Sequence, residues 1–416
     1  MNRLFQLLDH VSRLILISAV GVLLFSCSDK NRAVDKVGVL SSEMEKVTDI
    51  IPAAENVAEY YELLQGKRVA MVVNQTSQIG SKHLVDSLLD LKVDIVKIFA
   101  PEHGFRGDAD AGEVIKDGRD IKSGLPVVSL YGKKKKPTAE DLIGIEVIVF
   151  DIQDVGARFY TYISSLHYVM EACAENGVQL VVLDRPNPNA HYIDGPVLEN
   201  EFTSFVGMHP VPVVYGMTIG EYAQMINGEG WLKDGITTDL KVIHNRNYSH
   251  DSYYELPIKP SPNLPNFQSI LLYPSLCFFE GTQISVGRGT NSQFQILGHP
   301  KYVNGDFSFT PKSMQGAKYP KHENKLCQGV NLQHLTTGGL FDLKRLDLSY
   351  LINAYSVLSD QNEEFFLNNN FFEKLAGTQS LRKQIKEEWT EEQIRESWRE
   401  GLEQFKLKRT KYLIYD

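Results

Sequence analysis

The sequence predicts an α/β fold, in which a Rossmann-like domain with a mostly parallel sheet is followed by a smaller α+β domain. Two observations predict it. Short runs rich in Val, Ile and Leu alternate with helix-like stretches up to about residue 205. Beyond that point the alternation stops, and prolines and aromatics separate scattered short elements. We therefore expect domains at residues 57–205 and 206–416.

The predicted strands of the first domain are near-continuous apolar runs, which suit strands buried on both faces. They span residues 68–74, 93–100, 126–130, 146–151 and 179–184. Helices are predicted between them at residues 81–91, 139–143 and 163–176, and Gly177 is a plausible stop for the last of these. This order predicts a parallel sheet with helices on both faces.

The second domain gives weaker signals. We expect an extended stretch at 210–215, a helix at 218–227, ordered irregular chain at 254–274, and strands at 284–286 and 340–346. The clearest element is an amphipathic helix at 391–408. Its apolar residues recur at helical spacing and predict a core-facing stripe: Ile394, Trp398, Leu402 and Phe405.

The first 26 residues have the pattern of a lipoprotein signal peptide. Two arginines precede an apolar run at 14–25, which is too short to span a membrane well, and Ser26 precedes Cys27. We expect Cys27 to be the acylated first residue of the mature protein, which would be membrane-anchored in the cell envelope, periplasmic or outer-membrane. Residues 27–56 are polar and predict a flexible tether. The alternative is an uncleaved anchor helix with an incidental cysteine.

Charge and cysteine content exclude several classes of protein. The formal net charge is −9, and the leader carries one net positive charge, so the mature part is near −10. Such a surface disfavours nucleic acid as a partner. Cys173, Cys277 and Cys327 form no CxxC pair, which argues against a disulfide framework or a zinc knuckle.

Polar side chains follow four of the predicted strands, where ligands bind in an open parallel sheet. The candidates are Asn74, Glu102, His103, Arg106, Asp151, Gln153, Asp154, Arg158, Tyr160, Arg185 and Asn187. Each also has a structural interpretation. A lone acid could cap the next helix, His103 could be a packing histidine, and Arg185 could form a local ion pair. Their coincidence at successive strand ends favours a functional cleft.

Several chemistries lack their motifs. The chain has no G-x-G-x-x-G after the first strand, no P-loop, no G-x-S-x-G elbow and no H-E-x-x-H helix. Glu102, His103 and the two aspartates could bind a divalent cation, but nearby arginines would oppose it. We therefore expect no cofactor and no metal. Carboxylates, arginines, amides and tyrosines without a cofactor are typical of glycosidase sites.

A second cluster lies in the other domain, where Glu280 precedes Arg288 and Thr290. Gly287 and Gly289 flank the arginine and would let the backbone approach a ligand while the guanidinium pairs with a carboxylate. The alternative is a glycine-rich hairpin with a surface arginine.

Together these segments resemble the NamZ-type exo-β-N-acetylmuramidases, formerly a family of unknown function. The segments that carry the resemblance are residues 101–107, 151–160, 184–188, 280–290 and 397–412. The similarity runs from about residue 66 to the C-terminus. It implies a Rossmann-like domain plus an auxiliary domain, with the site in the cleft between them. It also implies hydrolysis of a β-1,4 bond that releases N-acetylmuramic acid from the non-reducing end of peptidoglycan fragments.

The resemblance also suggests roles. Glu102 is the candidate general acid, within a Glu-His motif that includes His103. Asp151 and Asp154 are candidates for base, nucleophile or orienter of the substrate's acetamido group. The lactyl carboxylate of N-acetylmuramic acid requires a cation in an acidic protein, and we favour Arg288, with Arg158 as the alternative.

Two other functions are compatible with the same residues. A non-catalytic lipoprotein could capture a peptidoglycan-derived oligosaccharide or muropeptide for an uptake system, and would need the arginines but no tuned carboxylate. An amidase or esterase acting on the peptide stem would need a nucleophile or a metal, for which the sequence gives no candidate.

Overall fold

The computed structural model describes residues 49–102, 104–106 and 117–416. The predicted signal peptide, Cys27, most of the predicted tether, and His103 lie outside these residues. Short 3₁₀ turns accompany the elements below: η1 (Ala53–Glu55), η2 (Glu140–Leu142), η3 (Asn200–Phe202), η4 (Lys233–Gly235) and η5 (Cys277–Gly281).

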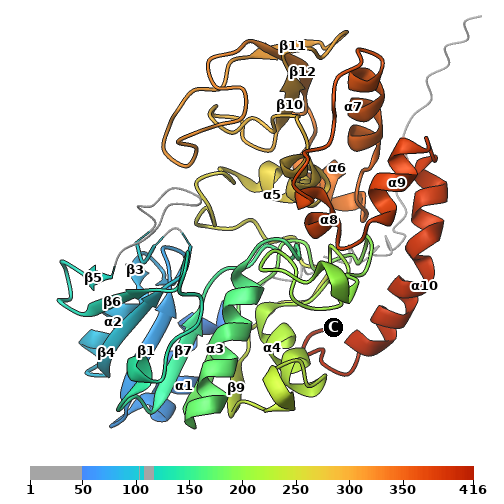
Figure 1. The fold of residues 1–416 in the computed structure, drawn as a ribbon. Coiled ribbons are helices and arrows are strands. Elements are labelled where there is room, and N and C mark those ends of the chain that lie inside the picture. The colour runs from blue at the N-terminus through green and yellow to red at the C-terminus, as the bar shows by residue number, and fades with distance from the viewer. Residues whose placement is uncertain (1–48, 103, 107–116) are drawn as a thin grey trace, which may run out of the picture. The chain divides into compact units, whose positions relative to one another are not determined.

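The first half is built on a seven-stranded sheet with the order β5-β6-β4-β1-β7-β8-β9 (Figure 1). Its strands are β1 (Arg68–Val73), β4 (Asp94–Ala100), β5 (Gly118–Arg119), β6 (Pro126–Ser129), β7 (Val147–Asp151), β8 (Gln179–Leu183) and β9 (Leu240–Ile243). All neighbours are parallel except the edge strand β5. The six parallel strands, numbered along the chain, lie in the order 3-2-1-4-5-6, which is the Rossmann order. The predicted fold class is confirmed.

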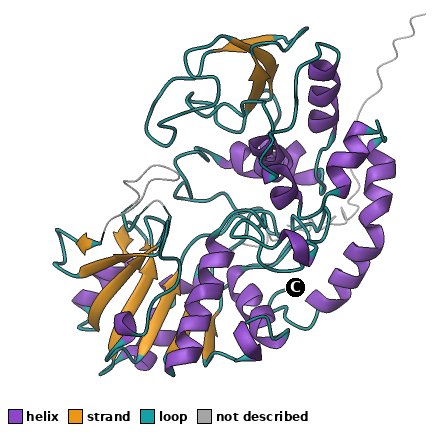
Figure 2. Cartoon of the chain, in the orientation of Figure 1, coloured by secondary structure: helices purple, strands orange, loops and turns teal. Residues whose placement is uncertain are grey.

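Helices cover both faces of the sheet because the central strands carry apolar side chains on both faces. On β1, Val69 and Met71 join the core formed with α1 (Val57–Leu64) and α2 (Leu84–Asp90). Ala70 and Val72 join the core formed with α3 (Tyr162–Asn176) and α4 (Ile219–Gly228). Figure 2 shows these helices against the strands. Burial of both faces explains the continuous apolar runs.

Helix α3 ends as predicted at Gly177, which adopts a left-handed φ of 65°. Two other predicted helices differ. Residues 139–143 form only the turn η2, and the start of the predicted helix at 81–91 is a small hairpin, β2 (Gln78–Ile79) and β3 (Lys82–His83). The sheet also takes in β9, so the domain boundary predicted at residues 205 and 206 would separate an edge strand from its sheet.

The second half contains a three-stranded antiparallel sheet, with the order β10-β12-β11, and a group of helices beside it (Figure 1). Its elements are α5 (Phe267–Leu276), β10 (Ile296–His299), β11 (Phe307–Phe309), β12 (Cys327–Asn331), α6 (Thr337–Asp342), α7 (Ser349–Ser359), α8 (Phe371–Ala376), α9 (Ser380–Lys386) and α10 (Glu391–Arg409). The strand predicted at 340–346 is wrong, because Thr336 caps a helix there by accepting from the amide of Gly339. Residues 284–286 make a single bridge, Ser285 with Gly298, and no named strand. Helix α5 begins inside the stretch predicted to be irregular, at a capping box of Asn266 and Ser269.

The predicted closing helix is confirmed as α10, with Ile394, Trp398, Leu402 and Phe405 buried. After it the chain returns to the first half. The hydroxyl of Tyr415 donates to Asp184 Oδ2 at 2.7 Å, just after β8. Glu221 Oε1, in α4, accepts from the amides of Ile414 and Tyr415 at 2.8 and 3.2 Å.

Within the ranges given above, no helix is both long and apolar enough to cross a membrane. Cys173, Cys277 and Cys327 are all buried and free.

Candidate active site

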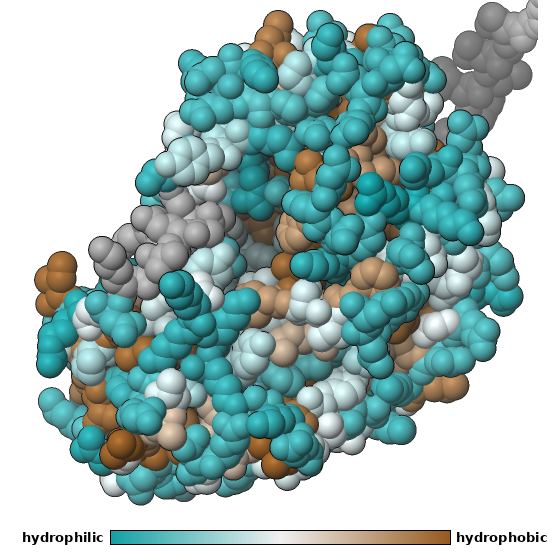
Figure 3. Space-filling view, in the orientation of Figure 1, coloured by the Kyte–Doolittle hydropathy of each residue, from teal (hydrophilic) through white to brown (hydrophobic). Residues whose placement is uncertain are grey.

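A pocket of about 700 Å³ opens beyond the carboxyl ends of the parallel strands. Its lining includes Glu102 after β4, Tyr131 after β6, and residues 159–162 after β7. The second half supplies the opposite wall, from α5, η5 and the loops around Arg288 and Lys321. Figure 3 shows the face hollowed between the two halves. In the Rossmann order, β1 and β7 meet at the topological switch point, so the pocket lies where such sheets bind ligands.

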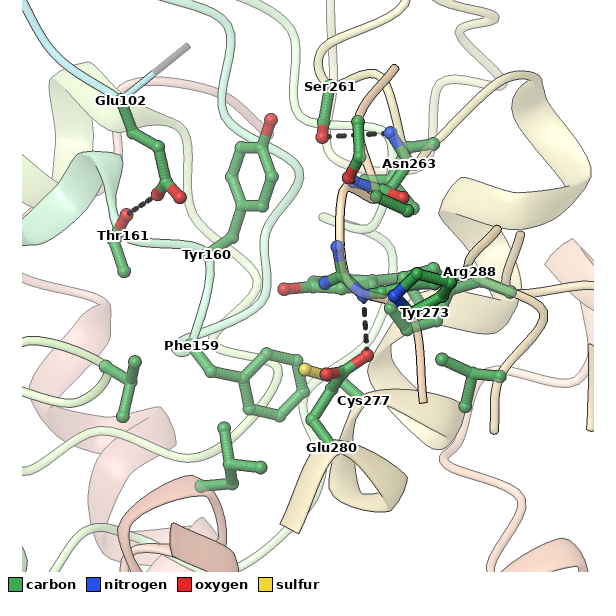
Figure 4. A pocket seen from close by; sticks show the side chains of 18 of the residues that line it. Glu102, Phe159, Tyr160, Thr161, Ser261, Asn263, Tyr273, Cys277, Glu280 and Arg288 are labelled. Atoms are coloured by element: carbon green, nitrogen blue, oxygen red, sulfur yellow. Dashed lines mark hydrogen bonds and ion pairs between the residues drawn. The ribbon is translucent and has the colours of Figure 1, made fainter. Parts of the chain in front are cut away.

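Glu102 is half-buried on the sheet side of the pocket. The hydroxyl of Thr161 donates to its Oε2 at 3.2 Å (Figure 4). The hydroxyl of Tyr131 also hydrogen-bonds to Glu102, and burial, followed by the charge of Glu102, raises the pKa of this tyrosine. The hydroxyl of Tyr162 approaches the backbone carbonyl of Glu102 at 3.4 Å. Two neutral hydroxyls thus contact a carboxyl group that lines the pocket, and a third contacts the backbone of the same residue.

The opposite wall carries an ion pair, in which Arg288 Nε donates to Glu280 Oε1 at 2.7 Å (Figure 4). The side chains are 28% and 22% exposed, respectively. Burial opposes ionisation of Glu280, but the charges of Arg288 and Lys321 outweigh it and lower the pKa of that carboxyl. The pair uses only Nε, and the terminal nitrogens of Arg288 make no hydrogen bond to the described residues. They can therefore bind an anion in the pocket.

Lys321 adds a second cation to this wall. Its Nζ donates to the carbonyls of Phe279, Thr282 and Ile284 at 3.0, 2.6 and 3.0 Å. Burial lowers the pKa of Lys321, although the charge of Glu280 opposes that shift. With one carboxylate between two cations, this wall is net positive in an acidic protein.

Aromatic rings form much of the remaining surface. Tyr273 contacts Phe159, Tyr160 and Phe294 edge to face, with ring centroids 5.3, 5.9 and 4.9 Å apart. The hydroxyl of Tyr160 donates to the carbonyl of Pro260 at 2.8 Å. A pocket with apolar faces and a few polar groups at its walls suits a sugar ring.

Asp151 and Arg185, two predicted site residues, lie outside the pocket. Asp151 is fully buried, and Arg185 pairs with both of its oxygens at 2.6 and 2.8 Å. A buried carboxylate whose two oxygens both accept hydrogen bonds from an arginine cannot contact a substrate in the pocket. The assignment of Asp151 as base or nucleophile is therefore wrong for this structure, as is substrate binding by Arg185, and the pair holds the ends of β7 and β8 together.

Asp154 is also buried behind the pocket wall. Its Oδ2 accepts from the hydroxyl of Tyr215 and from the amide of Gly156, while Oδ1 has no hydrogen-bond partner among the described residues. Burial raises the pKa of Asp154 to about 6, although the bonds from Tyr215 and Gly156 oppose the shift. This placement corrects its predicted role as a base or nucleophile.

The raised pKa predicts a pH dependence of stability. In the unfolded chain Asp154 ionises near its usual 3.8, so ionisation increasingly favours unfolding as the pH rises from about 4 to about 6. Over that range the free energy of unfolding of the wild-type protein should fall by up to about 3 kcal/mol relative to that of Asp154→Asn. Above pH 6 the variant should be the more stable, and below pH 4 the two should converge. Urea unfolding between pH 4 and 8 measures this, and a gap independent of pH would contradict it.

Arg158, the alternative cation for an anionic substrate, is completely buried. Its guanidinium donates to the carbonyls of Pro196, Val211, Leu375 and Ala376 at 2.8, 2.6, 3.1 and 2.7 Å. Burial lowers the pKa of Arg158 to about 9. The prediction of substrate contact is wrong here, because the side chain binds the last turn of α8 to the sheet half. Its neighbours Phe159 and Tyr160 do line the pocket.

Three predicted amides are buried, and one of them contacts a residue of the pocket. Asn74 Nδ2 donates to the hydroxyl of Tyr162 at 3.0 Å and so orients a pocket residue. Gln153 Nε2 donates to the carbonyls of Asp154 and Pro186, and Asn187 Nδ2 donates to the carbonyl of Met217. All three are buried, so none of them lines the pocket as a substrate contact.

Arg106 and Thr290 also have internal partners. Arg106 makes a bidentate pair with Asp120 at 2.8 and 2.9 Å. Thr290 donates to the carbonyl of Gly287 at 2.6 Å and stabilises the turn that carries Arg288. Gly287 and Gly289 have φ of 77° and 81°, and a Cβ on Gly289 would lie 2.7 Å from Pro320. These glycines thus allow the turn to pack closely against neighbouring segments of the same chain. The prediction that they let the backbone approach a ligand is wrong.

Of the predicted site residues, the structure therefore brings Glu102, Tyr160, Glu280 and Arg288 to one pocket. Sequence reasoning missed Tyr131, Tyr273 and the segment at 316–321. Tyr131 follows a predicted strand, so the rule that ligands bind beyond the carboxyl ends of parallel strands (the strand-end rule) could have found it. No group of three or more His, Cys, Asp or Glu side chains in the described chain could hold a metal ion.

Comparison with known proteins adds two family matches. Residues 69–268 match the family model described as exo-beta-N-acetylmuramidase NamZ, N-terminal, and residues 271–415 match its C-terminal counterpart. A curated relative is the peptidoglycan beta-N-acetylmuramidase NamZ of Bacillus subtilis (strain 168). It is 39% identical over 375 residues, which cover 86% of this chain and 89% of the relative.

Two crystal structures of DUF1343 family proteins from Bacteroides fragilis NCTC 9343 are similar to this one. The first is 44% identical, with a TM-score of 0.82, and the match covers 89% of this chain and 99% of that one. The second is 28% identical, with a TM-score of 0.76 and coverage of 88% and 99%.

Proposed function

The chain belongs to the NamZ family of exo-beta-N-acetylmuramidases, and from that membership we infer that it hydrolyses the β-1,4 bond at the non-reducing end of peptidoglycan fragments and releases N-acetylmuramic acid. It is accordingly a glycoside hydrolase. The observation that supports this substrate is the pocket itself. It sets the carboxyl group of Glu102 on one wall opposite the guanidinium of Arg288 on the other (Figure 4).

The two walls suggest a division of labour. Glu102 lies at a strand end among neutral hydroxyls and is placed to give its proton to the oxygen of the leaving sugar. N-acetylmuramic acid differs from N-acetylglucosamine by a lactyl ether that ends in a carboxylate. The terminal nitrogens of Arg288 supply the donors for that carboxylate, and Lys321 adds positive charge beside them. The aromatic surface packs against the faces of the sugar ring.

Release of a chromophore from a β-linked N-acetylmuramic acid glycoside tests the proposal. The purified protein should hydrolyse it and should leave the matching N-acetylglucosaminide nearly untouched. A binding lipoprotein without a catalytic acid would bind the glycoside and release nothing, and that result would refute the proposal. Product analysis on a longer glycan should show single N-acetylmuramic acid units rather than internal fragments.

We further propose that the protein is exported and anchored to a membrane through a lipid on Cys27. The support is the sequence alone: a charged start, a short apolar run and a serine before the cysteine. The anchor would hold the enzyme in the cell envelope, where peptidoglycan lies.

Cys27→Ser tests this anchor. A protein without the acylated cysteine should appear in the soluble fraction, whereas the wild-type protein should stay with membranes and show processing that globomycin blocks. Specific activity should be equal in both, because the described pocket begins far along the chain from residue 27. A Cys27→Ser protein that remains firmly in the membrane fraction would remove the lipoprotein proposal.

A further inference from the structure

An exposed aromatic side chain stands at the mouth of the pocket. Tyr319 is among the pocket-lining residues and yet is 82% exposed. A side chain with both properties lies where the pocket meets solvent. Lys318, also exposed, is beside it, with Nζ 5.9 Å from the centroid of the tyrosine ring. These two residues form what we call the rim.

The turn before the rim is tightly held. Met314 and Ala317 exchange backbone hydrogen bonds of 3.2 and 2.9 Å. The carbonyl of Gly316 accepts from Asn263 Nδ2 at 2.7 Å. Gly316 and Ala317 are both buried, so this side of the rim belongs to the packed structure.

The chain after the rim is held as firmly. Pro320 is buried against Gly289, close enough that a Cβ on that glycine would lie 2.7 Å away. Lys321 is fixed by the three carbonyls that its ammonium group contacts. Tyr319 is therefore presented to solvent by an ordered segment anchored on both sides.

A tyrosine ring held in this way offers a rigid apolar face at little cost in side-chain entropy. The faces of a pyranose carry C–H groups and pack well on such a ring. The hydroxyl oxygens of the sugar accept hydrogen bonds from an ammonium group. In an enzyme that removes a terminal sugar, that sugar fills the pocket. The rest of the substrate must leave through the mouth, which brings the next sugar to the rim.

We propose that Tyr319 and Lys318 form a binding subsite for the sugar on the leaving-group side of the scissile bond. This subsite rests on the proposed function, because it assumes that the terminal N-acetylmuramic acid occupies the pocket. Tyr319 stacks on the face of the N-acetylglucosamine unit, and Lys318 donates to its hydroxyl oxygens. The rim would thus favour natural glycan fragments over glycosides with small leaving groups.

The test uses a peptide-free disaccharide, N-acetylmuramic acid β-1,4-linked to N-acetylglucosamine. Tyr319→Ala should lower kcat/KM for this substrate about 3- to 10-fold, mainly through KM, because a stacking contact is lost. Tyr319→Phe should keep the wild-type value, since the ring face is retained. The inhibition constant of free N-acetylmuramic acid, which fills only the pocket, should change less than about 2-fold.

Leu326→Ala is a matched control, since Leu326 is 62% exposed on the same half and does not line the pocket. Unchanged kcat/KM in Tyr319→Ala would overturn the subsite. A loss confined to substrates that carry a peptide stem would overturn it too and assign the rim to the peptide. If the wild-type enzyme leaves the disaccharide intact, the proposed function fails. The subsite is then judged by whether Tyr319→Ala weakens binding of the disaccharide but not of N-acetylmuramic acid.

Discussion

Glu102→Gln should lower turnover of an N-acetylmuramic acid glycoside about 10²–10⁴-fold while substrate binding persists. The amide keeps the size of the side chain and can still bond to Thr161 and Tyr131, but it has no proton to give to the leaving oxygen. Initial rates give kcat, and equilibrium binding of the intact substrate to the variant gives the affinity.

Glu62→Gln provides the control, because Glu62 is an exposed carboxylate on α1, outside the pocket. It should retain the wild-type rate. Wild-type turnover in Glu102→Gln would eliminate Glu102 as the acid. Glu280 is the other carboxylate that lines the pocket within the described residues, but Arg288 and Lys321 favour its ionised form, which has no proton to donate. Asp151 and Asp154 would not replace Glu102, because both are buried behind the wall.

Arg288→Ala should weaken binding of N-acetylmuramic acid substrates about 10- to 150-fold, which corresponds to one charged hydrogen-bonded contact of about 1.5–3 kcal/mol. It should also reduce the preference for N-acetylmuramic acid over the N-acetylglucosamine analogue, because the analogue has no carboxylate for Arg288 to bind. Arg288→Lys should recover only part of the affinity, because lysine lacks the planar fork. Competition between the two monosaccharides measures both effects.

Glu280→Gln separates recognition from structure. Glu280 holds Arg288 by one bond to Nε, so the amide leaves the terminal nitrogens of the guanidinium in place for the substrate. We expect this variant to keep the preference for the muramic sugar. If Arg288→Ala lowers the affinity for both sugars equally and also lowers the Tm, Arg288 only stabilises the turn.

The sheet was predictable because burial on both faces produces unbroken apolar runs, and helices between successive strands then give parallel pairing. The strand-end rule also placed Glu102 and Tyr160 correctly at the pocket. It could not tell them from Asp151 and Arg185, which follow equivalent strands. Whether a carboxylate at a strand end faces solvent or pairs with an arginine depends on the residue that follows the neighbouring strand. The local sequence around the carboxylate does not show which residue that is.

The second half was less predictable for a similar reason. Arg158 follows the same strand as Tyr160, but two of its four carbonyl partners lie more than 200 residues away in α8. Tyr319 lies in a turn whose position depends on contacts with Asn263 and Gly289. Such long-range contacts leave no periodic pattern, so the rim of the pocket emerges only from the folded chain.

The last residues of the chain bear on the order in which the protein folds. Tyr415 bonds to Asp184 beside β8, and Glu221 accepts from two amides at 414 and 415. The first half therefore leaves two buried carboxylates incompletely bonded until residues 414 and 415 have been made. A fragment that stops near residue 268, where the N-terminal family match ends, would lack these partners. Closure of contacts across some 200 residues is slow, so we expect the final folding step to follow synthesis of residues 414 and 415, when the carboxylates of Asp184 and Glu221 gain these hydrogen-bond partners.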